Sequence, residues 1–175
     1  MNSFKADFKR YNEKFLINGL IFNPCFRYVF LMRICSKLNV LNPLGFVSRI
    51  LLKVNQVLYG INIPHTTKIG PGLFLSHYGN IIINPKTVIG SNCNIAQGVT
   101  IGQTNRGKRK GVPIIGNYVW IGANAVIVGG IKVGNNVLIS PLSFVVEDIP
   151  DNAVVMGNPA QVISFNGSGG YINNI

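Results

Sequence analysis

An aliphatic residue returns every six positions through most of this chain, and this period constrains the fold more than any other feature. The in-phase positions are Ile83, Ile89, Ile95, Ile101, Ile115, Ile121, Ile127, Val133, Ile139 and Val145. Small residues follow most of them, namely Gly90, Ala96, Gly102, Gly116, Gly122, Gly134 and Ser140. The period fits neither an α-helix nor a simple strand, but it suits coils of short strands and tight turns. We therefore expect a three-sided parallel β-helix with the in-phase residues inside and the small residues at its corners.

The six-residue rhythm is interrupted twice. From Leu75 to Ile83 the spacing is eight, which places an insertion of two residues within 76–80. From Ile101 to Ile115 the spacing is fourteen, so the loop Gln103–Pro113 is expected to leave the coil. Because regular coils serve stacking, such interruptions are the best places to look for function.

Residues 1–60 lack the period and show helical spacing instead. One apolar stripe follows Pro24 and a second follows Asn42-Pro43; the second consists of Leu44, Val47, Ile50, Leu51, Val54 and Leu58. We predict a helical N-terminal segment over 1–60 and a β-helix over 61–163 that carries the loop 103–113. The Gly-, Asn- and Ser-rich residues 164–175 are expected to form a flexible tail.

Basic residues stand among the apolar ones of the helical segment: Arg27, Arg33, Lys37, Arg49 and Lys53. Two interpretations remain open. The helices pack on one another and on the end of the β-helix with their charges in solvent, or they form a basic amphipathic surface that lies on an anionic membrane.

The charge distribution excludes several kinds of catalyst. The formal net charge is +11, and no carboxylate occurs between residues 14 and 146. The repeats therefore cannot supply an acidic pair or a Ser-His-Asp set. Only two histidines exist, His65 and His77, so a three-histidine zinc site is excluded and no metal is expected.

The composition indicates a protein of the cytoplasm. Although 47% of the residues are hydrophobic, no apolar stretch is long enough for a transmembrane helix, and no signal peptide precedes the helices. The three cysteines show no disulfide spacing.

The two interruptions of the rhythm hold the candidate functional side chains. His77 lies in the first one and can act as a general base on a hydroxyl, whereas His65 follows Pro64 and is interpreted as structural. The loop carries Arg106, Lys108, Arg109 and Lys110, which form either a solvated turn or a site for phosphates. Nucleic-acid binding is not expected, because no aromatic residues alternate with these cations.

The chain resembles the hexapeptide-repeat acyltransferases, in the branch near serine acetyltransferase. The stretches that carry the resemblance are Tyr59–Ile63, Lys68–Gly72, Leu75–Gly79, Gln97–Gly102, Val119–Ala123 and Gly157–Ala160. Residues Asn39–Asn42 and Arg49-Ile50 are also similar to the acetyltransferases of capsular and colanic-acid polysaccharide biosynthesis. The resemblance implies a left-handed β-helix, a homotrimer, and acetyl-coenzyme A as co-substrate in the groove between subunits.

The resemblance also implies roles for individual residues. His77 matches the catalytic histidine of the family, and Asn62 falls where the family has the Asp that orients it. Ala123 matches a backbone position that holds the pantetheine arm. Gly102, Gln103 and Thr104 match the start of the nearby loop. Independently of the resemblance, we assign Arg106, Lys108, Arg109 and Lys110 to the nucleotide phosphates of the co-substrate, and we expect Ser76 and Tyr78 to contact the acceptor.

Three departures from the family pattern bear on the acceptor. Asn62 can accept a hydrogen bond from an imidazole but cannot stabilise an imidazolium by charge. Ser76 replaces the Asp that serine acetyltransferases carry before the histidine, and Gly111-Val112 replace an Arg-His pair. A zwitterionic serine is thus left without an evident partner for its ammonium group.

We therefore predict an O-acetyltransferase that moves acetyl from acetyl-coenzyme A to a sugar hydroxyl of a surface polysaccharide, with His77 as general base. Serine O-acetylation, N-acetylation of an amino sugar and a non-catalytic membrane-docking scaffold are the alternatives. The expected partners are two further copies of the chain and a saccharide acceptor, free or lipid-linked. The expected location is the cytoplasm, with peripheral contact at the inner face of the cell membrane.

Overall fold

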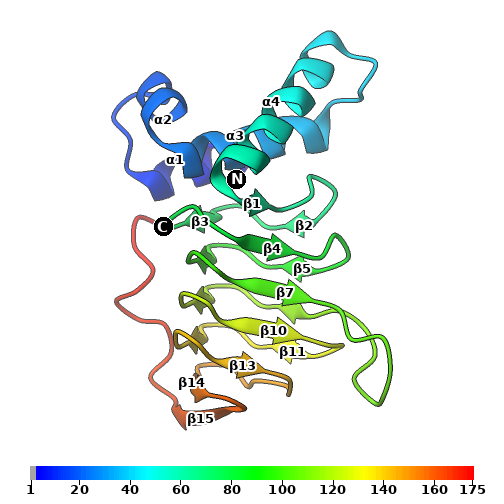
Figure 1. Ribbon diagram of the computed structural model, residues 1–175. Coiled ribbons are helices and arrows are strands. Elements are labelled where there is room, and N and C mark those ends of the chain that lie inside the picture. Colours follow the sequence, from blue (N-terminus) through cyan, green and yellow to red (C-terminus); the bar gives the residue numbers. More distant parts are fainter. Residues whose placement is uncertain (1–2) are drawn as a thin grey trace.

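The protein is a stack of β coils with helices at one end (Figure 1). The structure is a computed structural model and describes residues 3–175. The helices are α1 (Ser3–Tyr11), α2 (Leu16–Phe22), α3 (Pro24–Lys37) and α4 (Pro43–Tyr59). None of the helices in this range combines the length and the apolar character needed to cross a bilayer.

The strands form the three faces of a prism. Face A holds β1 (Ile61–Asn62), β4 (Ile81–Ile83), β7 (Thr100–Gly102), β10 (Val126–Val128) and β13 (Phe144–Val145). Face B holds β2 (Lys68–Ile69), β5 (Val88–Ile89), β8 (Ile114–Ile115) and β11 (Lys132–Val133). Face C holds β3 (Phe74–Leu75), β6 (Asn94–Ile95), β9 (Trp120–Ile121), β12 (Leu138–Ile139), β14 (Val154–Gly157) and the antiparallel β15 (Ala160–Ser164).

The predicted β-helix and its inward positions are confirmed. The neighbouring strands of successive coils are parallel and in register, so that Ile83, Ile101, Ile127 and Val145 stack on one another. All ten in-phase residues are at most 3% exposed. Seen from the helical end, the coils in Figure 1 wind anticlockwise as they recede, which makes the β-helix left-handed.

The small residues after the inward positions are explained by close approach between coils. A Cβ atom on Gly90 would lie 2.5 Å from the carbonyl oxygen of Gly116, and one on Gly116 equally close to that of Gly134. A larger side chain at these corners would push successive coils apart.

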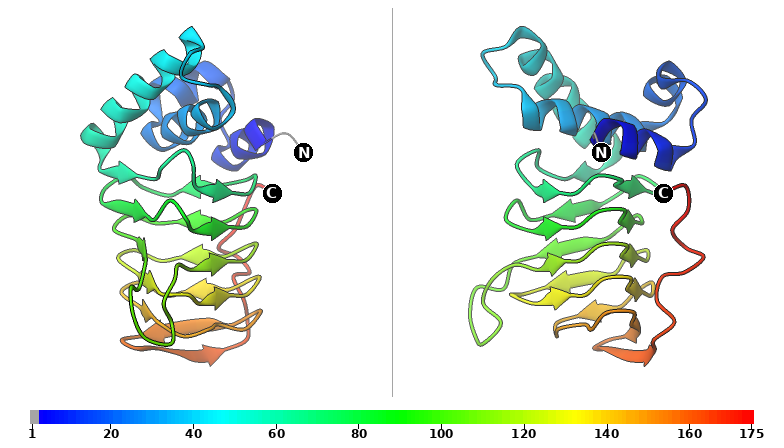
Figure 2. Two further views of the ribbon diagram at one scale, coloured as in Figure 1. Left: turned by 90° about the vertical axis from the view of Figure 1, so that its right-hand side faces the viewer. Right: turned by 180° about the vertical axis from the view of Figure 1, so that it is seen from behind.

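Both predicted interruptions are present. Leu75 pairs with Ile95 and Ile82 pairs with Thr100, so residues 76–81 span a corner that residues 96–99 span one coil later. The first coil thus carries two extra residues. The loop Gln103–Pro113 connects β7 on face A to β8 on face B and projects beyond the prism (Figures 1 and 2).

The two predicted helical stripes correspond to α3 and α4, and the sequence explains where each begins. Asn23 caps α3 by accepting a hydrogen bond from the amide of Phe26, at 3.0 Å. Asn42 caps α4 in the same way through the amide of Leu44, at 2.9 Å. A proline follows each cap, where its missing N–H costs nothing. Helices α1 and α2 were not among the predicted elements.

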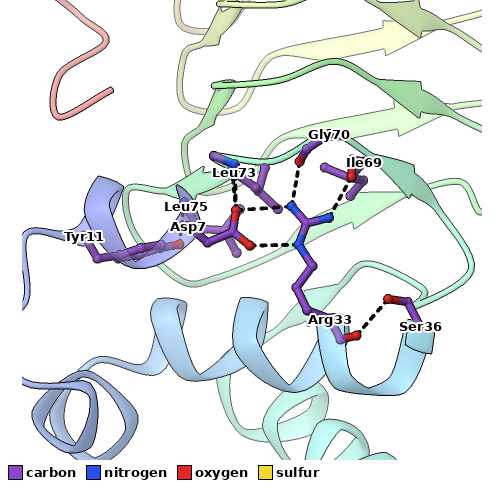
Figure 3. Close-up of polar contacts among 9 residues, drawn as sticks. Asp7, Tyr11, Arg33, Ser36, Ile69, Gly70, Leu73 and Leu75 are labelled. Carbon is purple, nitrogen blue, oxygen red and sulfur yellow. Dashed lines mark hydrogen bonds and ion pairs between the residues drawn. The ribbon is translucent and has the colours of Figure 1, made fainter. Parts of the chain in front are cut away.

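A buried polar network joins the helices to the first coil (Figure 3). Arg33 of α3 donates to the carbonyl oxygens of Ile69 and Gly70, both at 2.6 Å. Asp7 of α1 accepts hydrogen bonds from the amides of Gly72, at 2.8 Å, and Leu73, at 2.9 Å. These two side chains therefore satisfy four backbone groups at the end of the β-helix that have no further coil to pair with.

The C-terminal residues run back along the prism toward the helices (Figure 1). The ring of Tyr171 lies 4.9 Å from that of Trp120, and Ser168 donates to the carbonyl of Tyr118 at 2.8 Å. Arg10 of α1 donates to the carbonyl of Asn173. The division of the chain at residues 60 and 163 into separate folding units remains a prediction, and so does the flexibility of residues 164–175.

Candidate functional site

His77 lies in the corner that joins β3 to β4, the corner that carries the two extra residues. The residue is exposed, and its imidazole makes no hydrogen bond within residues 3–175. Ser76 and Tyr78 flank it in the same corner, and Tyr78 is 54% exposed. An accessible imidazole without a protein partner can accept a proton from a bound hydroxyl.

Aromatic contacts tie this corner to the helices. The ring of Tyr78 packs edge-on against that of Tyr59 in α4, with centroids 5.2 Å apart. The hydroxyl of Tyr59 accepts a hydrogen bond from Arg27 of α3 at 2.9 Å. The enlarged corner is therefore held in place from outside the β-helix, although it lies at a break in the repeat.

His77 begins a column of corner residues along the edge between faces C and A. The strand register places Gln97, Ala123 and Pro141 at the same position of the three following coils, each two residues after the inward residue of face C. The amides of Gln97 and Ala123 donate no hydrogen bond within the described residues. The predicted catalytic residue and the predicted pantetheine contact thus share one edge, whereas Pro141 has no N–H to offer.

Gln97 was not among the predicted site residues. It lies between His77 and Ala123 in the column and is half-buried. A spacing in the sequence could have identified it. His77 follows the inward residue Leu75 by two positions, Ala123 follows Ile121 by two, and Gln97 follows Ile95 by the same interval.

Asn62 lies on β1 of face A, where it pairs with Ile82 of β4. Its side chain is exposed and makes no hydrogen bond in the part of the chain described here, so it is not bonded to His77. The orienting role predicted for Asn62 remains a prediction.

The basic loop occupies the next edge of the prism, between faces A and B. Thr104 and Gly111 exchange two backbone hydrogen bonds of 3.0 and 2.9 Å, which close the base of the loop. Gly102 ends β7 beside Val128, and Gln103 donates to the side chain of Asn105. Within one chain the loop start and His77 therefore lie on different edges of the same face.

The four loop cations are not equivalent. The guanidinium of Arg109 is bonded to Glu147 and, at 3.0 Å, to Asp148. These carboxylates raise the pKa of Arg109, first through Asp148 and then through Glu147. In residues 3–175 the side chains of Arg106, Lys108 and Lys110 have no hydrogen-bond or ion-pair partner. These three remain available to phosphates.

A cavity of about 670 Å³ lies elsewhere, between the C-terminal end of α3, α4 and the first coil. Lys37, Arg49, His65 and Lys68 are among its lining residues, and no predicted site residue lines it. The column is the stronger candidate site, because it brings an imidazole and two unbonded backbone amides to one edge. Over residues 3–175 no three His, Cys, Asp or Glu side chains group as a metal site.

Comparison with known proteins identifies the family. A family profile described as "Bacterial transferase hexapeptide (six repeats)" matches residues 113–146. A serine acetyltransferase of Synechococcus elongatus is 35% identical over 124 residues, which cover 71% of this chain and 51% of that relative. A serine acetyltransferase of Helicobacter pylori is 37% identical over 119 residues, 68% of this chain and 70% of that relative. The chain belongs to the hexapeptide-repeat acyltransferases.

Solved structures agree with this membership. The serine acetyltransferase (CysE) of Neisseria gonorrhoeae in complex with serine superposes with a TM-score of 0.76 at 30% identity and covers 93% of this chain and 68% of that one. A serine acetyltransferase in complex with CoA superposes equally well at 26% identity, over 93% of this chain and 68% of that one. The predicted fold is confirmed, as is membership of the hexapeptide-repeat acyltransferases, although the chain spans only about half the length of the first of these relatives.

The predicted acceptor is wrong. We expected a sugar hydroxyl of a surface polysaccharide, whereas the relatives and structures just described are serine acetyltransferases. The expectation rested on the neutral residues at Ser76 and Gly111-Val112, and on the resemblance of Asn39–Asn42 and Arg49-Ile50 to polysaccharide acetyltransferases. Missing charges show which contacts an amino acid would lose, but they do not identify a sugar as the alternative.

Proposed function

We propose that this protein is a serine O-acetyltransferase that uses acetyl-coenzyme A. The observation that carries the proposal is the column of His77, Gln97 and Ala123, which aligns an unbonded imidazole with two free amides. It occurs in a chain that is 35% and 37% identical to serine acetyltransferases.

In this proposal His77 is the general base. It accepts the proton of the serine hydroxyl as that oxygen bonds to the acetyl carbon, and it then returns the proton to the departing thiolate. The co-substrate supplies acetyl as an activated thioester. Because the edge of His77 and the loop edge of a neighbouring copy would hold both substrates side by side, positioning contributes much of the rate.

The residues along the two edges suit the co-substrate. The free amide of Ala123 can donate to a pantetheine carbonyl. Arg106, Lys108 and Lys110 carry unpaired positive charge that matches nucleotide phosphates. Gln103 and Thr104 lie at the base of the same loop, so we assign them to the same end of the co-substrate.

The acceptor side is where this chain should differ from its relatives. No carboxylate stands beside His77, because residue 76 is a serine. We expect the KM for serine to be high, since its ammonium group has no charged partner in this corner. Ser76→Asp should therefore lower the KM for serine. Asn80→Asp is the control: it adds the same charge to the same corner, three residues beyond His77, and should leave the KM for serine unchanged.

Release of the coenzyme A thiol tests the function directly. Serine should give thiol release and an acetylated product whose ester is labile to mild base. Alanine, which lacks only the hydroxyl, should give none above the rate of hydrolysis. Thiol release with an amino sugar but not with serine would show that the proposal is wrong.

A homotrimer in the cytoplasm is part of the proposal. His77 and the loop lie on separate edges of one chain, and a neighbouring copy would bring the two edges together. Light scattering on the purified protein should give three times the mass of the chain. The location rests on Cys25, Cys35 and Cys93, which are free and buried. Membrane contact at the helical end is proposed separately.

A further inference from the structure

Helix α4 turns its apolar side away from the protein. All six residues of its predicted stripe are between 46 and 68% exposed: Leu44, Val47, Ile50, Leu51, Val54 and Leu58. The side that is buried against the rest of the chain consists of Gly45, Ser48, Leu52 and Asn55. A surface helix normally buries its apolar stripe, so this helix is built to face something outside the chain.

The exposure extends over the whole helical end. In α2, at the residue that precedes it and in the turn before α4, a further seven large apolar residues are between 46 and 87% exposed: Phe15, Leu16, Ile17, Ile21, Phe22, Val40 and Leu41. Both helices lie at the end of the prism away from the later coils (Figures 1 and 2). We call these thirteen residues, with Phe46 and Val57, the apolar end surface. Exposed apolar groups in such number mark an interaction site.

Positive charge predominates in this region. Residues 14–59 contain no carboxylate, and Lys14, Lys37 and Lys53 are exposed. Lys53 lies beside Phe46, Ile50 and Val54, whereas the Lys37 ammonium lies 4.7 Å from the centre of the Phe4 ring. Arg27 and Arg49 are held by neutral groups only, the latter by the carbonyls of Gly45, Cys35 and Leu38. Asp7 is paired with Arg33, and Glu13 bonds the side chain of Asn23, so the remaining cations at this end still outnumber the carboxylates.

We propose that the apolar end surface docks on the surface of an anionic lipid bilayer, with α2 and α4 lying in the interface. An anionic bilayer offers two things that this surface lacks: an apolar layer for the exposed side chains and negative charge for the lysines. A second copy of the chain would cover the apolar groups but would bring two sets of cations together. The proposal goes beyond the acetyltransferase activity and does not depend on it.

Co-sedimentation of the full chain with vesicles tests the proposal. Vesicles of phosphatidylcholine with about a third phosphatidylglycerol should bind the protein, and vesicles of phosphatidylcholine alone should bind it far less. Binding to the anionic vesicles should weaken at high salt because the charges are then screened. Lys53→Glu should lower the partition coefficient roughly fivefold or more.

A matched pair of double variants separates docking from general surface apolarity. Phe46→Ser with Val57→Ser removes two side chains of α4 that are 53 and 75% exposed. Phe165→Ser with Ile163→Ser removes two that are 64 and 57% exposed at the opposite end of the prism. The first variant should reduce vesicle partition about tenfold or more, and the second should leave it unchanged. Circular dichroism on both variants shows that they are folded.

Three results would overturn the proposal. The first is that the protein does not bind anionic vesicles. This result would stand with particular force if light scattering showed an assembly larger than a trimer that Phe46→Ser with Val57→Ser disrupts, because the apolar end surface would then join copies of the chain. The second is equal binding to neutral and anionic vesicles. The third is equal loss in both double variants. Thiol release with serine is a separate measurement, so failure of docking and failure of the acetyltransferase proposal are distinguishable.

Discussion

Asp7 and Arg33 form a buried ion pair between α1 and α3, with 2.8 Å between Oδ2 and Nε and side chains only 3 and 9% exposed. Each partner also bonds the backbone of the first coil (Figure 3). The pair therefore joins three parts of the chain that are far apart in sequence.

Asp7→Asn should destabilise the protein strongly, because it leaves the buried guanidinium of Arg33 without a counter-charge. The expected loss in the free energy of unfolding is about 3–5 kcal/mol, measured by urea denaturation. Glu147→Gln is the control, since the bond from Glu147 to Arg109 is exposed and should matter little. Equal losses in the two variants would contradict this account of the junction.

His77→Ala should lower kcat by roughly two to four orders of magnitude, the usual contribution of a positioned general base. Stability should change little, because the residue is exposed and has no hydrogen bond within residues 3–175. His65→Ala, which removes the only other histidine, should leave kcat nearly unchanged. An unaltered rate in the His77 variant would remove that residue from the mechanism.

Gly98→Ala should be poorly tolerated. Gly98 has φ of +74°, and an added Cβ would lie 1.9 Å from Oδ1 of Asn124 in the next coil. Strain and overpacking together should cost about 1–3 kcal/mol of stability, measured by thermal unfolding. Gly169→Ala, where an added Cβ meets nothing within 4 Å, serves as the control. A Gly98 variant as stable as the control would show that the coils can separate at this corner.

Stability should depend on the ionisation of His65. Burial, and then the positive charge of Arg49, lower the pKa of His65 below its ordinary value of 6.5. The unfolded chain therefore binds a proton more readily than the folded one. The contribution of the neutral imidazole is complete above pH 6.5 and is lost as pH falls from there through the lower folded pKa. Urea unfolding between pH 7 and 5 should show this loss, and His65→Gln should reduce it. A native NMR titration of His65 at or above 6.5 would contradict the prediction.

Much of the candidate site could be predicted before the structure was known. The interruption at His77 is visible because the six-residue period is strict on both sides of it. The column that links His77 to Ala123 is less visible, because it depends on the register between coils of 20 and 26 residues. Gln97 was missed because its place in the column is seen only when the positions two residues after Leu75, Ile95 and Ile121 are compared. The acceptor was mispredicted because the neutral residues at Ser76 and Gly111-Val112 show which contacts to an amino acid are lost, but not which molecule binds instead.

What the sequence by itself determined is the β-helix, its inward residues, its two interruptions and the positions where α3 and α4 begin. These follow from local causes: a repeating burial pattern, small residues at crowded corners, and an asparagine cap followed by proline. The tertiary structure alone decided that α4 presents its apolar stripe outward, that Asp7 meets Arg33, and that Arg109 is paired while its three loop neighbours are not. Periodicity shows that a helix has an apolar side, but which side is buried depends on contacts with α3 and the first coil. Those contacts join distant segments, and no spacing within either segment encodes them.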